Sequence, residues 1–258
     1  MGLLYERKYD VAAGRMNPLY QAKWGFESPH TLALERVQPG SKVVDVGCAS
    51  GYMAPALRAK GCKVTGIDEF PPVGDSALQE FVQADLNAGG FPLDPGAFHY
   101  VLLLDVIEHL RSPEAFLDAL RNSRRQAEET HIIVSAPNVA FMVTRFMLLG
   151  YFHYGSRGIL DMTHPRLFTF GTLRNLLEQA GYCIEETRGV PAPFPLALGN
   201  NAFARLLVKM NSALIRVSNS MFSYHIFMTA RPLPSLEWLL ERAVETSAAL
   251  SRQRATTE

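Results

Sequence analysis

The sequence has no excess of either charge. Its 25 Lys and Arg residues balance 25 Asp and Glu residues, the formal net charge at pH 7 is zero, and the pI is about 7.1. Proteins that hold nucleic acid generally carry a basic surface, because the phosphate backbone is polyanionic. The charge balance therefore gives no support to a nucleic-acid partner.

Cysteine is also scarce. Cys48, Cys62 and Cys183 are odd in number, scattered, and without the spacing of metal ligands. Separated cysteines of this kind are typical of a reducing compartment and argue against a zinc site. We expect free thiols and no bound metal.

Long apolar runs are absent as well. No run of about 18 or more uninterrupted apolar residues occurs, and residues 1–7 lack the basic-then-apolar order of a signal peptide. We expect a soluble, cytoplasmic protein without a transmembrane segment. With 258 residues, of which 48% are hydrophobic, the chain is expected to form one domain with a full core.

What the sequence does contain is a strand, a turn and a helix in residues 43–59. A β-branched run surrounds Asp45, and Gly47 and Gly51 precede residues 52–59, whose composition and spacing are helical. Glycine at such a turn permits positive φ and lets a ligand approach the first amides of the helix. The stretch predicts a nucleotide-cofactor site.

The next strand narrows the kind of cofactor. Residues 63–68 read as a short apolar strand that ends at Asp68, seventeen residues after Gly51. This is close to the offset of about 20 residues at which a carboxylate meets ribose hydroxyls. The glycines do not follow G-x-G-x-x-G, and Asp45 would repel a phosphate but not a cationic or zwitterionic ligand. A cofactor without a phosphate is indicated.

These residues resemble the first motif of the class I S-adenosylmethionine-dependent methyltransferases, D/E-x-G-x-G-x-G. Asp45, Gly47 and Gly51 match the motif, and Ala49 stands at its middle glycine. The resemblance covers roughly residues 40–190, with a closing strand near 222–230. It implies an α/β fold with a Rossmann-like sheet of seven strands, mostly parallel with an antiparallel last strand, and helices on both faces. The implied cofactor is S-adenosyl-L-methionine, with S-adenosyl-L-homocysteine as its product.

The resemblance also implies roles for residues at the carboxyl ends of the strands. The aminopropyl group would lie near Asp45 and Gly47, and the ribose near Asp68. The adenine amino group would lie near Asp85, after a third strand at 80–86; alternatively, Asp85 caps the turn at 87–90. The complete cofactor-binding set that we expect is Asp45, Gly47, Cys48, Ala49, Gly51, Asp68, Glu69, Asp85, Leu86, Asp105 and Val106.

A fourth strand is expected at residues 98–105, because this run is almost continuously apolar. The sequence that ends it, D-V-I-E-H-L, resembles the D/E-x-x-E-H fourth motif of many small-molecule enzymes of the family. Asp105 or Val106 would line the wall near the sulfonium, and Glu108 and His109 would cap a helix that starts near 112. His109 is a candidate general base; alternatively, it holds the backbone or lies on the adenosine side.

A fifth strand is expected at 131–138, followed by an apolar stretch at 139–154 that either covers the site or completes the core. Residues 161–169 then resemble the D-x-T-H-x-R-x-F-T segment of a subgroup of the family. His164 is the second candidate base, Asp161 would orient its ring, and Arg166 would hold an anionic or polyhydroxylated substrate. In the alternative, Thr169 caps the next helix and Asp161 pairs with Arg166.

The first 40 residues precede the cofactor fold and are rich in aromatic residues. A helix is expected to start at 28–30, where Ser and Pro precede His30. Tyr20, Trp24 and His30 are candidate substrate contacts in an N-terminal cap. The alternative is that the aromatic residues cover one edge of the sheet.

The C-terminal part is expected to hold a strand at 181–187, an amphipathic helix at 201–222, a closing strand at 224–230 and a surface helix at 235–250. The basic residues of the amphipathic helix, Arg205, Lys209 and Arg216, lie on a different face from its apolar residues. This helix can pack within the chain, close the substrate pocket, contact a second subunit in a homodimer, or rest on an anionic membrane. The expected divisions are a cap at 1–40, a core at 41–190, an insertion at 191–221, a closing strand at 222–231 and a helix with a tail at 232–258.

These features together predict a methyltransferase that acts on a hydroxyl of a small molecule, a sugar or a lipid-linked intermediate. Because the donor methyl group is already activated, holding donor and acceptor in line supplies most of the catalysis. N- or C-methylation is an alternative. So is a fold that binds the cofactor or a partner protein without turnover. A nicotinamide oxidoreductase would share these elements but needs the dinucleotide glycine spacing.

Overall fold

The computed structural model describes residues 9–10, 15–16, 24–72, 76–122, 130–150, 154–155, 158–234, 240 and 244. Tyr20 and most of the helix expected at 235–250 lie outside these residues. A short antiparallel pair, β1 (Tyr9–Asp10) and β2 (Arg15–Met16), precedes the main sheet.

One sheet of seven strands organises the chain, in the order β5-β4-β3-β6-β7-β9-β8. Five strands are parallel and follow each other by crossovers, and β9 runs antiparallel between β7 and β8. The predicted fold is confirmed. The strands are β3 (Lys42–Val46), β4 (Lys63–Asp68), β5 (Glu80–Gln83), β6 (Tyr100–Leu104), β7 (His131–Pro137), β8 (Tyr182–Val190) and β9 (His225–Pro232).

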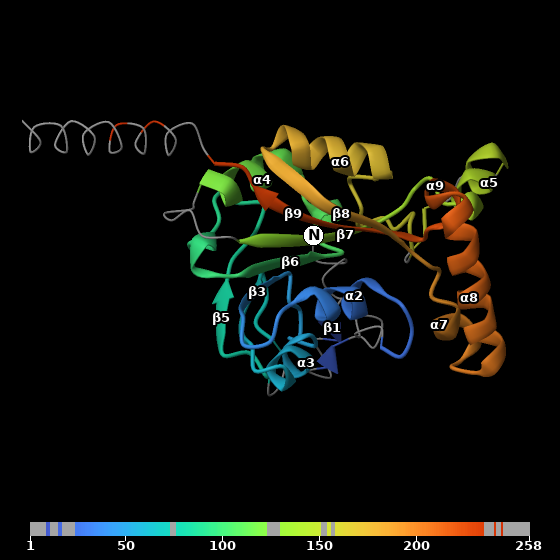
Figure 1. Cartoon of the computed structure of the whole chain (residues 1–258), viewed down its shortest axis with the longest axis horizontal. Helices are drawn as coiled ribbons and strands as arrows, with labels where there is room; N and C mark the ends of the chain where they lie inside the picture. Colours follow the sequence, from blue (N-terminus) through green and yellow to red (C-terminus); the bar gives the residue numbers. More distant parts are fainter. Residues whose placement is uncertain are drawn as a thin grey trace, which may run out of the picture.

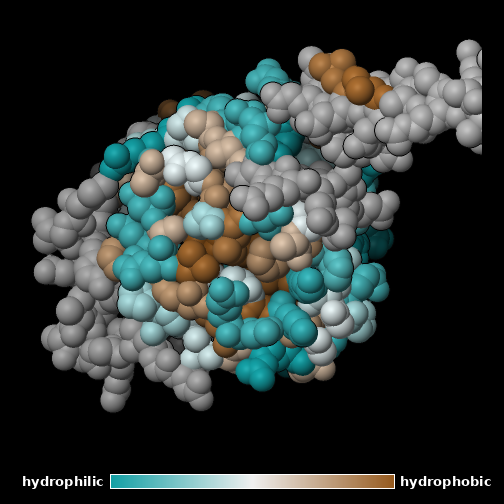
Figure 2. All heavy atoms as spheres, turned by 90° about the vertical axis from the view of Figure 1, so that its left-hand side faces the viewer, coloured by the Kyte–Doolittle hydropathy of each residue, from teal (hydrophilic) through white to brown (hydrophobic). Residues whose placement is uncertain are grey.

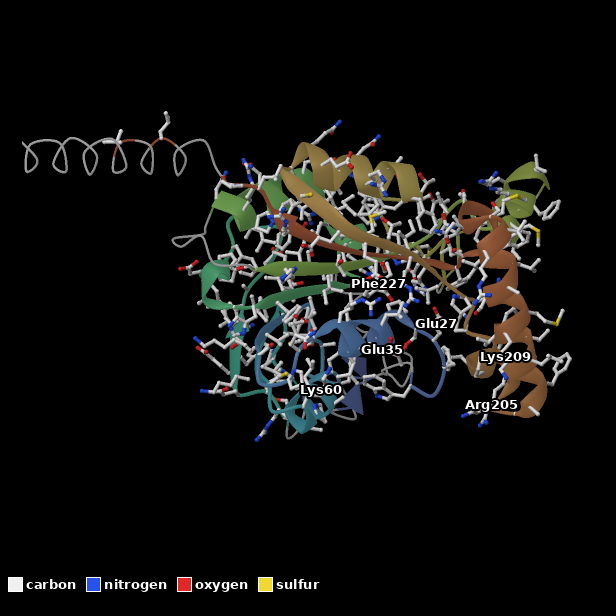
Figure 3. All side chains as sticks on the ribbon, in the orientation of Figure 1. Glu27, Glu35, Lys60, Arg205, Lys209 and Phe227 are labelled. Carbon is white, nitrogen blue, oxygen red and sulfur yellow. The ribbon has the colours of Figure 1, made fainter. Side chains whose placement is uncertain are left out.

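Helices cover both faces of the sheet, as Figure 1 shows. One face packs against α2 (Pro29–Arg36) and α3 (Ala54–Ala59), and the other against α4 (Pro113–Asn122) and α6 (Phe170–Gln179). The central strands are buried on both sides, which explains their continuously apolar sequences. Phe227 of β9 is fully buried in the layer that contains α2 and α3 (Figure 3).

Two of the expected helix starts have side-chain caps. The Ser28 hydroxyl accepts from the amide of Thr31 at the start of α2, and the Thr169 hydroxyl accepts from the amide of Thr172 at the start of α6. The helix predicted at 201–222 is instead two helices, α8 (Ala202–Val217) and α9 (Asn219–Phe222). Ser218 separates them, because its extended backbone ends the first and its hydroxyl caps the second.

Four of the described helices project beyond the carboxyl ends of the parallel strands. They are α5 (Met142–Gly150), which follows β7, and α7 (Phe194–Leu198), α8 and α9, which lie between β8 and β9. Figure 1 places them together at one end of the molecule. At the other end, hydrophilic side chains surround a central hydrophobic area (Figure 2).

Candidate active site

A tight turn with positive φ angles follows β3 at the carboxyl edge of the sheet. Gly47, Ala49 and Gly51 have φ angles of 68°, 51° and 73°. Ala49 tolerates a conformation that is uncommon outside glycine. The amide of Gly47 donates to the Ile67 carbonyl at 2.7 Å, which ties the turn to β4. The turn at the predicted position is confirmed.

Asp68 at the end of β4 holds this turn in place. Its Oδ2 accepts a hydrogen bond from the Ala49 amide at 2.9 Å, and its Oδ1 accepts from the Phe70 amide at 3.1 Å. Each carboxylate oxygen can accept a second bond, so both oxygens retain capacity for a ligand. The predicted strand end at Asp68 is confirmed, the structure adds its contact with Ala49, and its role at a ribose stays a prediction.

Asp45 lies behind the turn, almost completely buried. Within the part of the chain that the structure describes, its Oδ2 has no hydrogen-bond partner. Burial, with a smaller contribution from the charge of Asp68, raises the pKa of Asp45 from 3.8 to about 7. A buried carboxylate oxygen of this kind is suited to a cationic hydrogen-bond donor.

The carboxylates of Asp45, Asp68 and Asp105 all act on the hydroxyl of Tyr52, the residue that follows Gly51. Burial first, and then these three carboxylates with Cys48, raises the pKa of the Tyr52 hydroxyl well above 10. Burial, followed by Asp45 and Asp68, raises the pKa of the Cys48 thiol. Among the described residues, no Lys or Arg forms an ion pair with Asp45 or Asp68. The region therefore has a negative potential that favours a cation over a phosphate.

Asp105 is held by Ser135 and His225, which no sequence motif indicated. Ser135 at the end of β7 donates its hydroxyl to Oδ1 of Asp105 at 2.6 Å, and Nε2 of His225 lies 3.4 Å from Oδ2. Asp105 has a positive φ of 55°. His225 begins the antiparallel strand β9, so it lies at the same sheet edge where the parallel strands end. The predicted strand ends at 131–138 and 224–230 were the signal that could have identified both residues.

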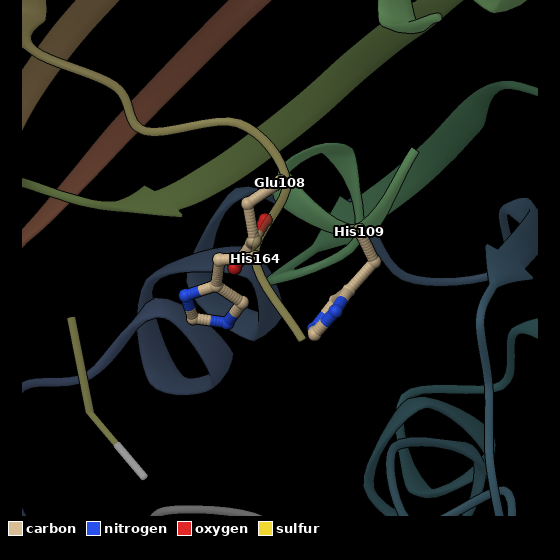
Figure 4. Close-up of side chains that lie close together, drawn as sticks. All are labelled: Glu108, His109 and His164. Carbon is tan, nitrogen blue, oxygen red and sulfur yellow. The ribbon is translucent and has the colours of Figure 1, made fainter. Parts of the chain in front are cut away.

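Glu108, His109 and His164 form a second cluster, shown in Figure 4. The rings of His109 and His164 meet edge to face with centroids 4.7 Å apart. Nδ1 of His109 lies 3.0 Å from the Thr163 carbonyl, and Nδ1 of His164 lies 3.2 Å from a carbonyl of the same loop.

The two carbonyl contacts define the chemistry of these imidazoles. A carbonyl oxygen only accepts, so Nδ1 of each ring carries the hydrogen and Nε2 of each neutral ring has the lone pair. One ligand atom from each of Glu108, His109 and His164 lies within 4.8 Å of the others. This donor set can accept protons, and its carboxylate and imidazoles also suit a divalent metal. The spacing of the sequence did not predict this grouping, because His164 comes from a distant loop.

The prediction that Asp161 orients His164 is wrong. Oδ1 of Asp161 accepts from the amide and hydroxyl of Thr163, at 2.8 and 2.9 Å, whereas the His164 ring bonds the Ile159 carbonyl. The alternative pairing of Asp161 with Arg166 is also wrong, since Arg166 forms an exposed ion pair with Glu114 at 3.1 Å. The short side chain of Asp161 finds its nearest donors two residues away, as in an Asx turn.

The family of the chain follows from a comparison with known protein families. A model of the methyltransferase domain matches residues 21–187. The chain belongs to the methyltransferase-domain family. The resemblance to methyltransferases is thereby confirmed for the family. The alternative of a nicotinamide oxidoreductase is set aside.

Curated relatives of this methyltransferase domain include two named ubiquinone biosynthesis O-methyltransferase. The protein from Psychrobacter arcticus is 32% identical over 108 residues, covering 38% of this chain and 42% of its own length. The protein from Chromobacterium violaceum is 33% identical over 95 residues, covering 31% and 38%. The chain thus spans less than half the length of these relatives.

Solved structures show the same fold at low sequence identity. The 1,6-didemethyltoxoflavin-N1-methyltransferase of Burkholderia thailandensis, with bound 1,6-didemethyltoxoflavin and S-adenosylhomocysteine, has a TM-score of 0.54 and 14% identity, covering 90% of this chain and 87% of its own. A SAM-dependent methyltransferase from Aquifex aeolicus has a TM-score of 0.52 and 13% identity, covering 90% and 98%. Both confirm the class I methyltransferase architecture.

The remaining predicted cofactor residues lie along the edge of this methyltransferase domain. Asp85 is exposed two residues after β5, and its Oδ1 accepts from the Asn87 amide at 2.8 Å, so its alternative role as a turn cap is present. Leu86 packs partly against the core, and the Glu69 carbonyl accepts from the Gln83 side chain. Their contacts with an adenosine remain predictions.

The N-terminal aromatic residues reach the site through a chain of rings. His30 is buried and packs edge to face on Tyr52 at 5.3 Å between centroids, and Trp24 lies 6.3 Å from His30. Tyr52 is the residue that faces the three carboxylates. Trp24 and His30 therefore adjoin the site, and their contact with a substrate remains a prediction. None of the described helices is long and apolar enough to span a membrane.

Proposed function

We propose that this chain transfers a methyl group from S-adenosyl-L-methionine to a hydroxyl group of a small-molecule, sugar or lipid-linked acceptor. The observation that carries the proposal is a group of acidic side chains at the glycine turn: Asp68 holds Ala49, Asp45 is buried with Oδ2 unpaired among the described residues, and both act with Asp105 on Tyr52. The cofactor is a cation that carries a sulfonium and an ammonium group, so this potential attracts it, whereas a pyrophosphate would be repelled.

The residues present fit this cofactor. Oδ2 of Asp45, buried and without a described partner, would accept the ammonium group. Asp68 would receive the ribose hydroxyls while it holds Ala49. Gly47 has no side chain, and Val106 packs where its Cβ would lie. When bound, the cofactor would supply a methyl group activated by the sulfonium.

Two histidine sites are candidates for the general base. We favour His164, which has its lone pair on Nε2, and His109, which packs against its ring with the same tautomer, is the alternative base of this cluster. The second candidate is His225, whose Nε2 faces Asp105. Either residue would take the proton from the acceptor hydroxyl as the oxygen attacks. Asp161 would act on the substrate only indirectly, by shaping the loop, and Arg166 would have to leave Glu114 to bind an anionic acceptor.

The acceptor atom is proposed from the curated relatives, which are named O-methyltransferases. N- or C-methylation is the alternative, and the solved structure of an N1-methyltransferase has a similar fold. The direct test is transfer of labelled methyl groups from the cofactor to phenols, sugars and lipid-linked hydroxyls. Saturable cofactor binding without transfer to any acceptor would instead support the non-catalytic alternative.

Replacing Asp68 with asparagine is expected to weaken cofactor binding by about 10- to 100-fold, because hydrogen bonds to a charged acceptor contribute about 1.5–3 kcal/mol. Calorimetric titration with S-adenosyl-L-methionine measures this change. Asp94→Asn is the matched control. The Asp94 carboxylate also accepts from a backbone amide, but Asp94 precedes the start of β6 and so lies away from the carboxyl ends of the strands. Near-normal affinity of the Asp68 variant would remove this residue from the cofactor site.

Replacing His164 with glutamine is expected to lower kcat by about 10²- to 10⁴-fold, the usual contribution of a general base, with unchanged cofactor affinity. Single-turnover transfer and cofactor titration separate the two quantities. His131→Gln is the control, because His131 pairs with Glu185 at the start of β7. If His164→Gln retains its turnover and His225→Gln loses it, the base is His225.

A further inference from the structure

Helix α5 exposes apolar side chains almost all around its axis. Thr144 is its buried residue, and Arg145 is its one charged residue. Five large apolar side chains are exposed, with exposed fractions from 36% to 83%: Val143, Phe146, Met147, Leu148 and Leu149. An apolar helix of this kind is normally buried, since water disfavours contiguous apolar surface.

Helix α8 carries a second exposed apolar stripe. The face of α8 that packs against the rest of the protein contains the buried residues Ala204, Val208 and Asn211. The exposed stripe follows helical spacing, with exposed fractions from 43% to 80%, and consists of Phe203, Leu206, Met210, Leu214 and Val217. The apolar residues of this stripe therefore do not form the packing face of the helix.

The two helices belong to the same projecting end of the molecule (Figure 1). Nη2 of Arg145 on α5 donates to the Ser220 hydroxyl on α9 at 3.1 Å, and α9 follows α8 after one residue. This end also bears the carboxyl ends of the parallel strands. We call the exposed residues of α5 and α8 the apolar end surface.

The four helices of this end carry charges of one sign. The segments that form α5, α7, α8 and α9 contain Arg145, Arg205, Lys209 and Arg216 and no Asp or Glu. Figure 3 shows Arg205 and Lys209 on α8. The whole chain is neutral, so this distribution is local. Apolar side chains beside cations are the pattern of a helix that lies in the interface of an anionic bilayer.

We propose that the apolar end surface docks on a membrane that contains anionic lipids. The apolar side chains would enter the acyl boundary while the cations meet the lipid phosphates. A second copy of the chain is a poorer occupant, because a two-fold contact would bring these cations together without acidic residues from the same helices to pair with them. The contact is interfacial, since no described helix can span the bilayer. This inference does not depend on the proposed methyl transfer.

Vesicle flotation tests the proposal with phosphatidylcholine alone and with added phosphatidylglycerol. We expect binding to the anionic vesicles that decreases with salt. A triple variant that neutralises the cations of α8 is expected to lower the partition coefficient onto anionic vesicles by about tenfold or more. Its substitutions are Arg205→Gln, Lys209→Gln and Arg216→Gln. Phe146→Ser/Leu149→Ser is expected to abolish binding. Because the replaced side chains are exposed, both variants should retain the wild-type circular dichroism and unfolding midpoint.

Matched control variants replace exposed cations and an exposed leucine that lie outside the apolar end surface. Lys63→Gln/Arg174→Gln/Arg231→Gln neutralises three exposed cations, and Leu233→Ser replaces an exposed leucine after β9. Both should bind like the wild type. Absence of vesicle binding, equal binding to neutral and anionic vesicles, or a stable dimer in sedimentation that buries this surface without lipid would each overturn the proposal.

Discussion

Replacing Asp45 with asparagine is expected to weaken S-adenosyl-L-methionine binding by about 100-fold and, at the same time, to stabilise the cofactor-free protein. The first effect follows because truncating one side of a buried, hydrogen-bonded charge pair costs about 2–5 kcal/mol. The second follows because this carboxylate is buried and Oδ2 has no described partner. One substitution therefore separates function from stability.

The stabilisation of the cofactor-free protein by Asp45→Asn should increase with pH. Burial raises the pKa of Asp45 from 3.8 to about 7 in the folded protein. Protonated Asp45 favours the folded state. Its contribution to the free energy of unfolding is complete below pH 3.8 and is lost as the pH rises through about 7. A difference of about three pKa units corresponds to at most about 4 kcal/mol. The advantage of Asp45→Asn should thus be largest near pH 8 and vanish near pH 4.

Urea unfolding at several pH values and calorimetric titration measure the two effects. In the wild type, cofactor affinity should rise as the pH increases through about 7, because the ionised carboxylate binds the ammonium group. In the variant, affinity should be weak and lack this dependence. Asp85→Asn, at an exposed carboxylate, is the stability control. Destabilisation by Asp45→Asn at pH 8 would contradict the account of this residue.

The second large effect is expected at Gly47. A Cβ at this position would lie 2.7 Å from Cγ2 of Val106, and φ is 68°. Gly47→Ala should therefore cost about 2–4 kcal/mol of stability, from the left-handed backbone together with overpacking. Because Val106 follows Asp105, its displacement would also disturb the acceptor side and lower kcat/KM by about 100-fold.

Two further variants isolate the cause. Gly40 has a similar φ of 75°, and a Cβ there would meet nothing within 4 Å, so Gly40→Ala should cost only about 1–2 kcal/mol. Gly47→Ala/Val106→Ala should recover stability relative to the sum of its single variants, which a double-mutant cycle with chemical denaturation measures. If Gly47→Ala and Gly40→Ala cost the same, contact with Val106 is not the cause.

The sequence predicted the fold well because the fold depends on regular patterns. Alternating runs of β-branched strands and helices, with a glycine turn after Asp45, allow few arrangements other than a doubly wound sheet. Asp68 was also predictable, since the end of the second strand must lie beside the end of the first. These inferences need only strand order and the positions of strand ends.

The finer parts of the site depend on side-chain geometry, which spacing does not fix. Asp161 was assigned to His164 because the two residues are close in sequence, yet its carboxylate reaches Thr163 first. His225 was missed because β9 is inserted between β7 and β8, which brings a late residue to Asp105. The sequence pattern left the role of the α8 stripe open, because the packing face of this helix, Ala204, Val208 and Asn211, has no regular apolar pattern of its own.

The central claim is that the carboxylates around the glycine turn bind a cationic adenosyl cofactor. Calorimetric titration of the purified protein at pH 8 with S-adenosyl-L-methionine, S-adenosyl-L-homocysteine and oxidised nicotinamide dinucleotide tests it most directly. The account predicts saturable binding of the first two compounds and none of the third. Binding of the dinucleotide, or failure of both adenosyl compounds to bind the folded protein, would contradict it.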